Sequence, residues 1–127
     1  MQHILLVALG GAIGASMRHL ANLAALRLAG PHFPFGTLFV NVAGSLAMGL
    51  FIGWLARRTG GSSNELRLLI ATGFLGGFTT FSAFSLDFAS LWQRGAMMEA
   101  TVYALASVLL SMIAVFVGLW LLRGAPA

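Results

Sequence analysis

Four apolar segments constrain what this chain can fold into more than any other feature of its sequence. A helix that crosses a membrane needs roughly 20 apolar residues, and residues 3–28, 35–56, 66–92 and 97–122 each reach that length. The segments do not resemble copies of one another, and the polar loop 57–65 separates the second from the third. We therefore predict an all-α membrane protein in which residues 1–127 form a single four-helix transmembrane domain.

The composition fits a protein that leaves little of itself outside the bilayer. The chain is 59% hydrophobic and 8% charged, whereas soluble domains carry about 25% charged residues. Cysteine is absent, and His3, His19 and His32 lack the spacing of a zinc site. Since no nucleophile–base pair is present either, we do not expect an enzyme. The net charge of +4 comes without a basic stripe, which argues against nucleic acid as a partner.

The arginines bear on how the chain is oriented in the membrane. We interpret the N-terminus as part of the first span and not as a removable signal. Four spans would place both termini on the side of the loop 57–65. That side carries four arginines and the other side two, with Arg18 buried nearer to the second group: Arg57, Arg58, Arg67 and Arg123 against Arg27 and Arg94. Because this bias is weak for the positive-inside rule, we predict insertion in both orientations and an antiparallel homodimer of inverted halves.

Two pairs of glycines have the spacing of close helix contacts. Gly10 and Gly14 lie in the first segment, and Gly49 and Gly53 lie in the second. Small residues four positions apart let helix backbones approach each other. We interpret all four glycines as packing positions.

The third segment is predicted to break near its middle. Residues 72–88 read TGFLGGFTTFSAFSLDF, and each of Gly73, Gly76 and Gly77 costs a helix interior about 1 kcal/mol against alanine. Hydroxyls and aromatic rings follow. Irregular backbone at membrane depth is tolerated only where protein buries it or where it lines a cavity. We therefore expect the break, placed at residues 76–80, to be where the protein works.

Uncharged polar side chains form stripes on two segments. Thr37, Asn41 and Ser45 lie four residues apart on the second, and Tyr103, Ser107 and Ser111 do so on the fourth, so each set shares one helix face. We expect Ser45 and Ser111 to hydrogen-bond to neighbouring helices. We expect Asn41 to line a pore, because its amide is costly to bury and its NH2 group donates well to an anion.

Three further side chains leave two readings each. Phe81 and Phe84 follow the glycines and serve either as packing or as ring edges, which carry positive charge density and suit an anion path. Arg18 lies inside the first segment, where a cation either faces a cavity or a partner or else extends to the interface.

Four motifs resemble those of the small bacterial fluoride channels, the Fluc or CrcB family. They are GTLxVNxxG at 36–44, TGFLGGxTTFSxFS at 72–85, YxxxS at 103–107 and GxxxR at 14–18, and the resemblance extends over nearly the whole chain. It implies a dual-topology homodimer with two pores, in the bacterial cell inner membrane, that passively exports fluoride and so relieves fluoride toxicity.

The resemblance also implies roles for individual residues. The fluoride pore would be lined by Phe81, Phe84, Asn41, Tyr103, Ser107, Thr80 and Ser82, with Arg18 near its mouth. The backbone carbonyls of Gly76 and Thr79 would hold a structural sodium ion at the dimer centre. Asp87 stands where the family often has glutamate, and Phe78 stands where a smaller aliphatic residue is common.

The residues themselves also favour a cation at the break. Carbonyls freed there would cost several kcal/mol each if left unpaired in lipid, and no carboxylate precedes Asp87 in this stretch. The rival reading is a simple kink whose carbonyls pair with the Ser82 hydroxyl or with a neighbouring helix.

Two other functions remain open from the residues. A small dual-topology, proton-coupled multidrug-type exporter also has four spans, but it needs a carboxylate within the membrane. The first two segments contain no acidic residue, which leaves Asp87 as the candidate. The other possibility is a membrane assembly subunit that transports nothing.

Overall fold

The computed structural model describes residues 1–58 and 64–123, and the side chain of Arg123 is left out of the description. Four helical stretches are long and apolar enough to cross a membrane: Gln2–Ala29, Phe35–Arg57, Asn64–Gln93 and Met97–Leu122. The prediction of an all-α protein with four long apolar helices is therefore confirmed. Residues 59–63 of the predicted polar loop and residues 124–127 lie outside the described residues.

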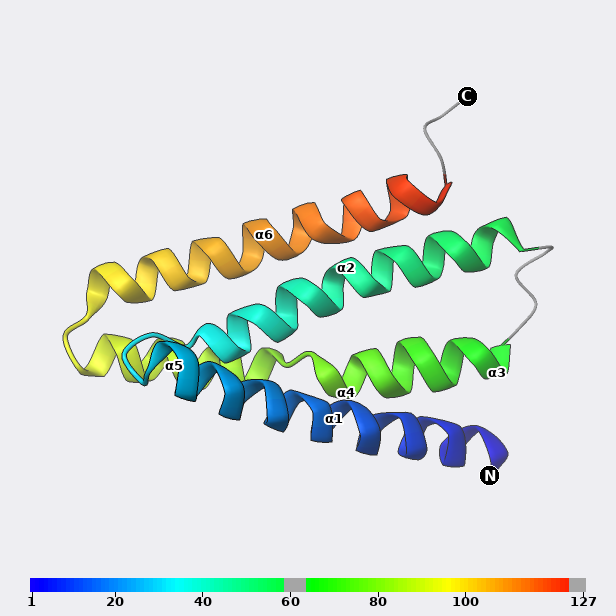
Figure 1. Ribbon diagram of the computed structural model, residues 1–127, viewed down its shortest axis with the longest axis horizontal. Helices are drawn as coiled ribbons and strands as arrows, with labels where there is room; N and C mark the ends of the chain where they lie inside the picture. The colour runs from blue at the N-terminus through cyan, green and yellow to red at the C-terminus, as the bar shows by residue number, and fades with distance from the viewer. Residues whose placement is uncertain (59–63, 124–127) are drawn as a thin grey trace.

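The chain folds into the helices drawn in Figure 1. The first two are α1 (Gln2–Ala29) and α2 (Phe35–Arg57), and the last is α6 (Met97–Arg123). The third span is a composite of α3 (Asn64–Arg67), the π-helical segment η2 (Leu68–Leu75), α4 (Gly76–Phe78) and α5 (Phe81–Gln93). The N-terminus, the end of α2 and the start of α3 lie at one end of the molecule, as an even number of spans requires.

Two helix pairs make up the body of the structure. Helix α2 packs along α6, and α1 packs along η2 and α4 (Figure 1). The pairs meet where α1 contacts α2 and where α5 contacts α6. Much of the outer surface consists of exposed apolar side chains, such as Ile13, Leu109 and Phe116. Such a surface suits lipid or a second protein chain better than water.

Glycines bring the backbones of both pairs into direct contact. A Cβ atom on Gly14 would overlap the carbonyl oxygen of Phe74, and one on Gly10 would overlap that of Leu69. A Cβ atom on Gly49 would overlap the carbonyl oxygen of Val115 in α6. The prediction that these glycines are packing positions is confirmed, and Gly53 likewise faces α6 at Leu119 and Leu122.

The third span is broken within the predicted range, just after its two adjacent glycines. Gly76 and Gly77 remain helical within α4, and the irregular backbone is confined to Thr79 and Thr80. Thr79 has φ −87° and ψ 160°, and Thr80 has φ −156° and ψ 124°, so both are extended. The break therefore lies within the predicted residues 76–80, at the C-terminal end of that range. Gly77 instead lets α1 approach, because a Cβ atom there would lie 2.6 Å from the carbonyl oxygen of Gly11.

Candidate functional site at the helix break

The backbone of Thr80 is paired with a side chain from another helix. Asn41 Oδ1 accepts a hydrogen bond from the Thr80 amide at 2.7 Å, and Asn41 Nδ2 donates to the Thr80 carbonyl oxygen at 3.0 Å. In a continuous helix the Thr80 amide would donate to the carbonyl of Gly76, four residues earlier. The Thr80 amide therefore donates to Asn41 and is not available to the carbonyl of Gly76.

The hydroxyl of Thr80 likewise removes a helical donor from a carbonyl group, about one turn further along the chain. Thr80 is the N-cap residue of α5, and its Oγ1 accepts from the Ala83 amide at 3.1 Å. Threonine is among the preferred residues for this position, because it satisfies one of the free amides at a helix start. In a continuous helix the Ala83 amide would donate to the carbonyl of Thr79. The carbonyls of Gly76 and Thr79, singled out by the sequence, have thus both lost their helical donors.

Neighbouring helices satisfy two other carbonyls at the break. Arg18 in α1 donates from Nε to the carbonyl oxygen of Gly77 at 3.0 Å, and Asn41 in α2 serves that of Thr80. For these two carbonyls the structure matches the reading as a kink with neighbouring helices as partners. The kink hypothesis also named the Ser82 hydroxyl as a partner for a carbonyl. Ser82 is exposed, and its hydroxyl oxygen lies 3.4 Å from the hydroxyl oxygen of Thr80.

Arg18 belongs to the break and not to either cavity described below. Its side chain is half-buried, and its Nε atom is committed to Gly77. A cation within a span needs such a partner, because charge is expensive at membrane depth. The structure therefore gives Arg18 a backbone partner in α4, where the sequence left a cavity or a partner, or else the interface, as alternatives.

A cavity of about 400 Å³ lies beside the break between α2, α5 and α6. It brings together six of the residues that the sequence singled out for the site: Asn41, Thr79, Thr80, Phe81, Phe84 and Ser107. Ser45, Ser111 and apolar side chains complete the lining, and none of the described residues that line it is charged. The cavity thus offers neutral donors in an otherwise apolar space.

Two hydroxyls in this cavity have no hydrogen-bond partner. The Oγ atoms of Ser107 and Ser111 are buried and unpaired among the residues described by the structure. The expectation that Ser111 hydrogen-bonds to a neighbouring helix is therefore wrong for this chain on its own. The reason is that Met112 and Val115, which line the cavity near it, carry no N–H or O–H group, and the described residues leave the Ser107 hydroxyl unpaired as well. A buried hydroxyl left unpaired costs about 1–3 kcal/mol, so both serines are free to serve a ligand.

The two phenylalanines differ in how much the chain covers them. Phe81 is 78% exposed, whereas Phe84 is half-buried against Tyr103, with ring centroids 5.1 Å apart. The rings of Phe81 and Phe84 lie 5.6 Å apart, and both line the cavity. Packing within the chain therefore explains part of the position of the Phe84 ring. It does not explain the position of Phe81, which lies at an open side of the cavity.

Tyr103 lies behind the cavity and does not line it. Its side chain is fully buried, and its hydroxyl donates to Asp87 Oδ2 at 3.0 Å. Its ring also meets Phe33 edge-on, with centroids 5.5 Å apart. Helical spacing placed Tyr103 on one face with Ser107 and Ser111, but its long side chain reaches across to α5, where its hydroxyl donates to Asp87.

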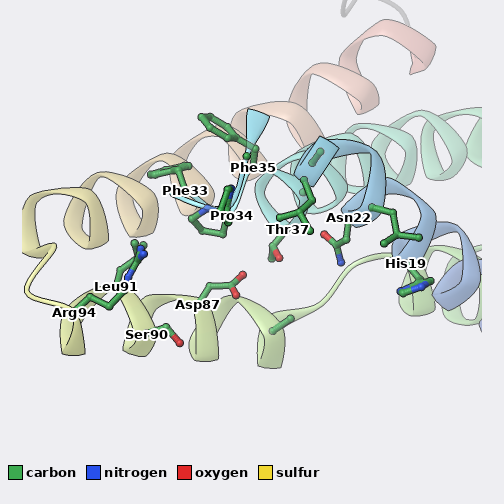
Figure 2. Close-up of a pocket in the computed structure, with 17 residues that line it drawn as sticks. His19, Asn22, Phe33, Pro34, Phe35, Thr37, Asp87, Ser90, Leu91 and Arg94 are labelled. Carbon is green, nitrogen blue, oxygen red and sulfur yellow. The ribbon is translucent and has the colours of Figure 1, made fainter. Parts of the chain in front are cut away.

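A second cavity, of about 520 Å³, lies at the end of the molecule that holds the connection between α1 and α2. Figure 2 shows Asp87 on α5 and Thr37 on α2 pointing toward each other across it. His19, Asn22 and Arg94 add further polar groups to a largely apolar wall. Asp87 therefore lines this second cavity and accepts the hydrogen bond from Tyr103.

The backbone at the break offers carbonyl oxygens as candidate ligands for a metal ion. Within residues 1–58 and 64–123, no group of three or more His, Cys, Asp or Glu side chains is placed to hold a metal. The carbonyls of Gly76 and Thr79 remain as oxygen donors whose helical partners have been diverted. Hard cations prefer oxygen ligands of this kind.

The fold and site define a small multi-span membrane protein whose broken third span borders a largely apolar cavity with uncharged hydrogen-bonding groups in its wall. Residues 5–119 match the family described as CrcB-like protein, Camphor Resistance (CrcB). The chain therefore belongs to the CrcB-like family.

Close relatives cover essentially the whole chain. It is 63% identical over 126 residues to "Fluoride-specific ion channel FluC" of Mesorhizobium japonicum, with 99% of this chain and 100% of the relative covered. Proteins of the same name from Chelativorans sp. and Hyphomonas neptunium are 64% and 58% identical, each over 97% of this chain and over 98% and 97% of their own lengths. Together with the four spans, these matches make the chain a multi-pass bacterial membrane protein.

Proposed function

We propose that this chain is a fluoride channel that lets fluoride leave the cell passively. The observation that carries the proposal is the pair of unpartnered hydroxyls, Ser107 and Ser111, in the cavity beside the break. It is supported by the relatives, which are named fluoride-specific ion channels and align over almost the full chain.

The lining of the cavity suits a small, strongly hydrated anion. An anion that leaves water must replace its hydrogen bonds, and the serine O–H groups supply donors without a charge. A full cationic site would hold the anion too tightly, since conduction requires binding that permits both entry and exit. Phe81 and Phe84 add ring edges, which carry partial positive charge, at the same cavity.

The proposal includes an antiparallel homodimer as the conducting unit. Phe81 is 78% exposed although it lines the cavity, so a single chain leaves that side open. A second copy packed over α5 would cover Phe81 and separate the cavity from lipid. The apolar outer faces of α5 and α6 are compatible with such an interface.

The proposal also includes a structural sodium ion held by the carbonyl oxygens of Gly76 and Thr79. Their helical donors are engaged by Asn41 and Thr80, so a cation would compensate two carbonyls that lack lipid or water partners. Two inverted copies would double the number of oxygen ligands. When bound, the ion would supply only positive charge that fixes the two breaks.

The test is fluoride release from liposomes that contain the purified protein, with and without a proton gradient. A channel releases fluoride down its own gradient and needs no proton gradient, whereas a proton-coupled exporter depends on one through a carboxylate such as Asp87. We expect release that is equal in both conditions and absent from empty liposomes. Release that requires the proton gradient, or no release at all, would contradict the proposal.

A further inference from the structure

The carboxamide of Asn41 is committed to the backbone of Thr80 through both of its polar atoms. Oδ1 accepts from the Thr80 amide at 2.7 Å, and Nδ2 donates to the Thr80 carbonyl at 3.0 Å. The backbone fixes which atom is nitrogen, because the reversed amide would set donor against donor and acceptor against acceptor. The oxygen and one of the two N–H groups are therefore already used before an anion arrives.

This pair of hydrogen bonds is possible only while the backbone of Thr80 is extended. Its φ of −156° and ψ of 124° are those of a strand, in which the N–H and C=O of one residue point to the same side, as where antiparallel strands exchange two hydrogen bonds. In an α-helix these two groups point in opposite directions along the axis. One carboxamide cannot reach both there, so Asn41 stabilises the extended state of Thr80 and not the helical one.

The conformation of Thr80 in turn decides where α5 begins. An N-cap residue is non-helical, and Thr80 Oγ1 accepts from the amide of Ala83 in the first turn of α5. Phe81 is the first residue of α5, and Phe84 lies about one turn later. Both line the cavity beside the break, so the direction of each ring follows from the start of the helix.

We infer that Asn41 is a positioning residue, which acts on conduction by holding Thr80 extended and thereby orienting Phe81 and Phe84. This inference rests on the proposed function, and it assigns Asn41 to the backbone where the sequence favoured the pore. This role requires a carboxamide, because leucine has no polar atom and serine carries its donor and acceptor functions on a single oxygen, whereas the amide presents them on two atoms. Glutamine offers the same pair on a chain one methylene longer.

The experiment measures the backbone of Thr80 and the flux separately. The 13Cα and 13Cβ chemical shifts of Thr80, which distinguish extended from helical backbone, are recorded without fluoride in wild type, Asn41→Leu, Asn41→Ser and Asn41→Gln. Ser45→Ala is the control for the shifts, since Ser45 lies one turn further along the same cavity wall. Fluoride release is then measured for the Asn41 variants in liposomes.

We expect the Thr80 shifts to leave their wild-type values in Asn41→Leu and Asn41→Ser and to stay in place in Ser45→Ala. Fluoride release should fall about tenfold or more in the same two variants, as the loss of two hydrogen bonds of ordinary strength suggests. Asn41→Gln should recover part of both properties. If Asn41→Leu does not assemble, Asn41→Ser decides.

Two results would overturn the inference. Thr80 shifts that stay at wild-type values while release is lost would make Asn41 a direct ligand of fluoride. Shifts that move while release stays at the wild-type rate would show that the position of Thr80 does not matter for conduction. Because the shifts are recorded without fluoride, a wild-type protein that releases none would refute the proposed function and still leave the backbone result readable.

Discussion

Arg18 Nε donates a hydrogen bond to the carbonyl oxygen of Gly77, 3.0 Å away and 59 residues later in the chain. The bond joins α1 to the last helical turn before the break. It gives a half-buried guanidinium a partner, and it gives a carbonyl near the break a donor that the helix does not supply. Arg18 therefore has a protein partner, which is one of the alternatives that its position within the span allowed.

The first prediction follows from this bond. Arg18→Gln should lower the free energy of unfolding by about 1.5–3 kcal/mol, which is the usual contribution of a hydrogen bond to a charged group. It should also lower fluoride release at low fluoride concentration. The control is Arg27→Gln, which removes an exposed arginine from the last turn of the same helix. Equal unfolding midpoints for the two variants, measured in the same detergent, would show that the bond to Gly77 contributes nothing.

The glycine contacts give a second prediction, with a matched pair in one helix. Gly14→Ala should destabilise the protein by about 1–3 kcal/mol, as overpacking generally does, because its Cβ atom would overlap the backbone of Phe74. Gly11→Ala should be tolerated, since the nearest atom to its Cβ would be the Gly73 carbonyl oxygen at 3.9 Å. Thermal unfolding of both variants is the measurement. A Gly14→Ala protein as stable as Gly11→Ala would contradict the packing of α1 against η2.

The third prediction separates the two phenylalanines. Phe81→Ile should reduce fluoride release strongly with little change in stability of the single chain, because the Phe81 side chain is 78% exposed there. Phe84→Ile should reduce release and stability together, because its ring packs on Tyr103. Both substitutions keep an apolar side chain and remove the ring edge. Release rates and unfolding midpoints are measured side by side, and normal release in both variants would leave the rings with packing alone.

The fourth prediction concerns the proposed sodium ion. We expect fluoride release to persist in sodium and to decline when sodium is replaced by a large organic cation during long dialysis. The physical reason is that the Gly76 and Thr79 carbonyls have lost their helical donors and would remain uncompensated in lipid. Release that survives complete removal of sodium, together with an empty dimer axis in an experimental structure, would refute the cation.

The four helices could be predicted because lipid imposes one simple requirement on a sequence. Long apolar segments have few alternatives to helices in a membrane, and the glycine pairs already indicated which faces approach each other. The break was harder to locate. Gly76 and Gly77 suggested its position through their low helix propensity, yet propensity is a weak local term. Both glycines stay helical, and α1 packs against Gly77.

What places the break at Thr80 is a residue 39 positions away in sequence. No local sequence pattern predicts that the Asn41 side chain reaches the Thr80 backbone, because this contact forms only when α2 packs beside the start of α5. The same holds for Tyr103, whose stripe on α6 was visible while its bond to Asp87 was not. Helical periodicity predicts the face on which a side chain lies. It does not predict how far the side chain reaches or which group accepts its hydrogen bond.

The central claim is that the hydroxyls of Ser107 and Ser111 serve fluoride, and one flux experiment tests it most directly. Fluoride release is measured from liposomes that hold wild type, the double variant Ser107→Ala with Ser111→Ala, or Thr101→Ala, which removes an exposed hydroxyl bonded to Met97 on the same helix. We predict release at the wild-type rate for Thr101→Ala and a loss of about tenfold or more for the double variant, as expected when two donors are removed from a desolvated anion. Release by the double variant at the wild-type rate would contradict the account.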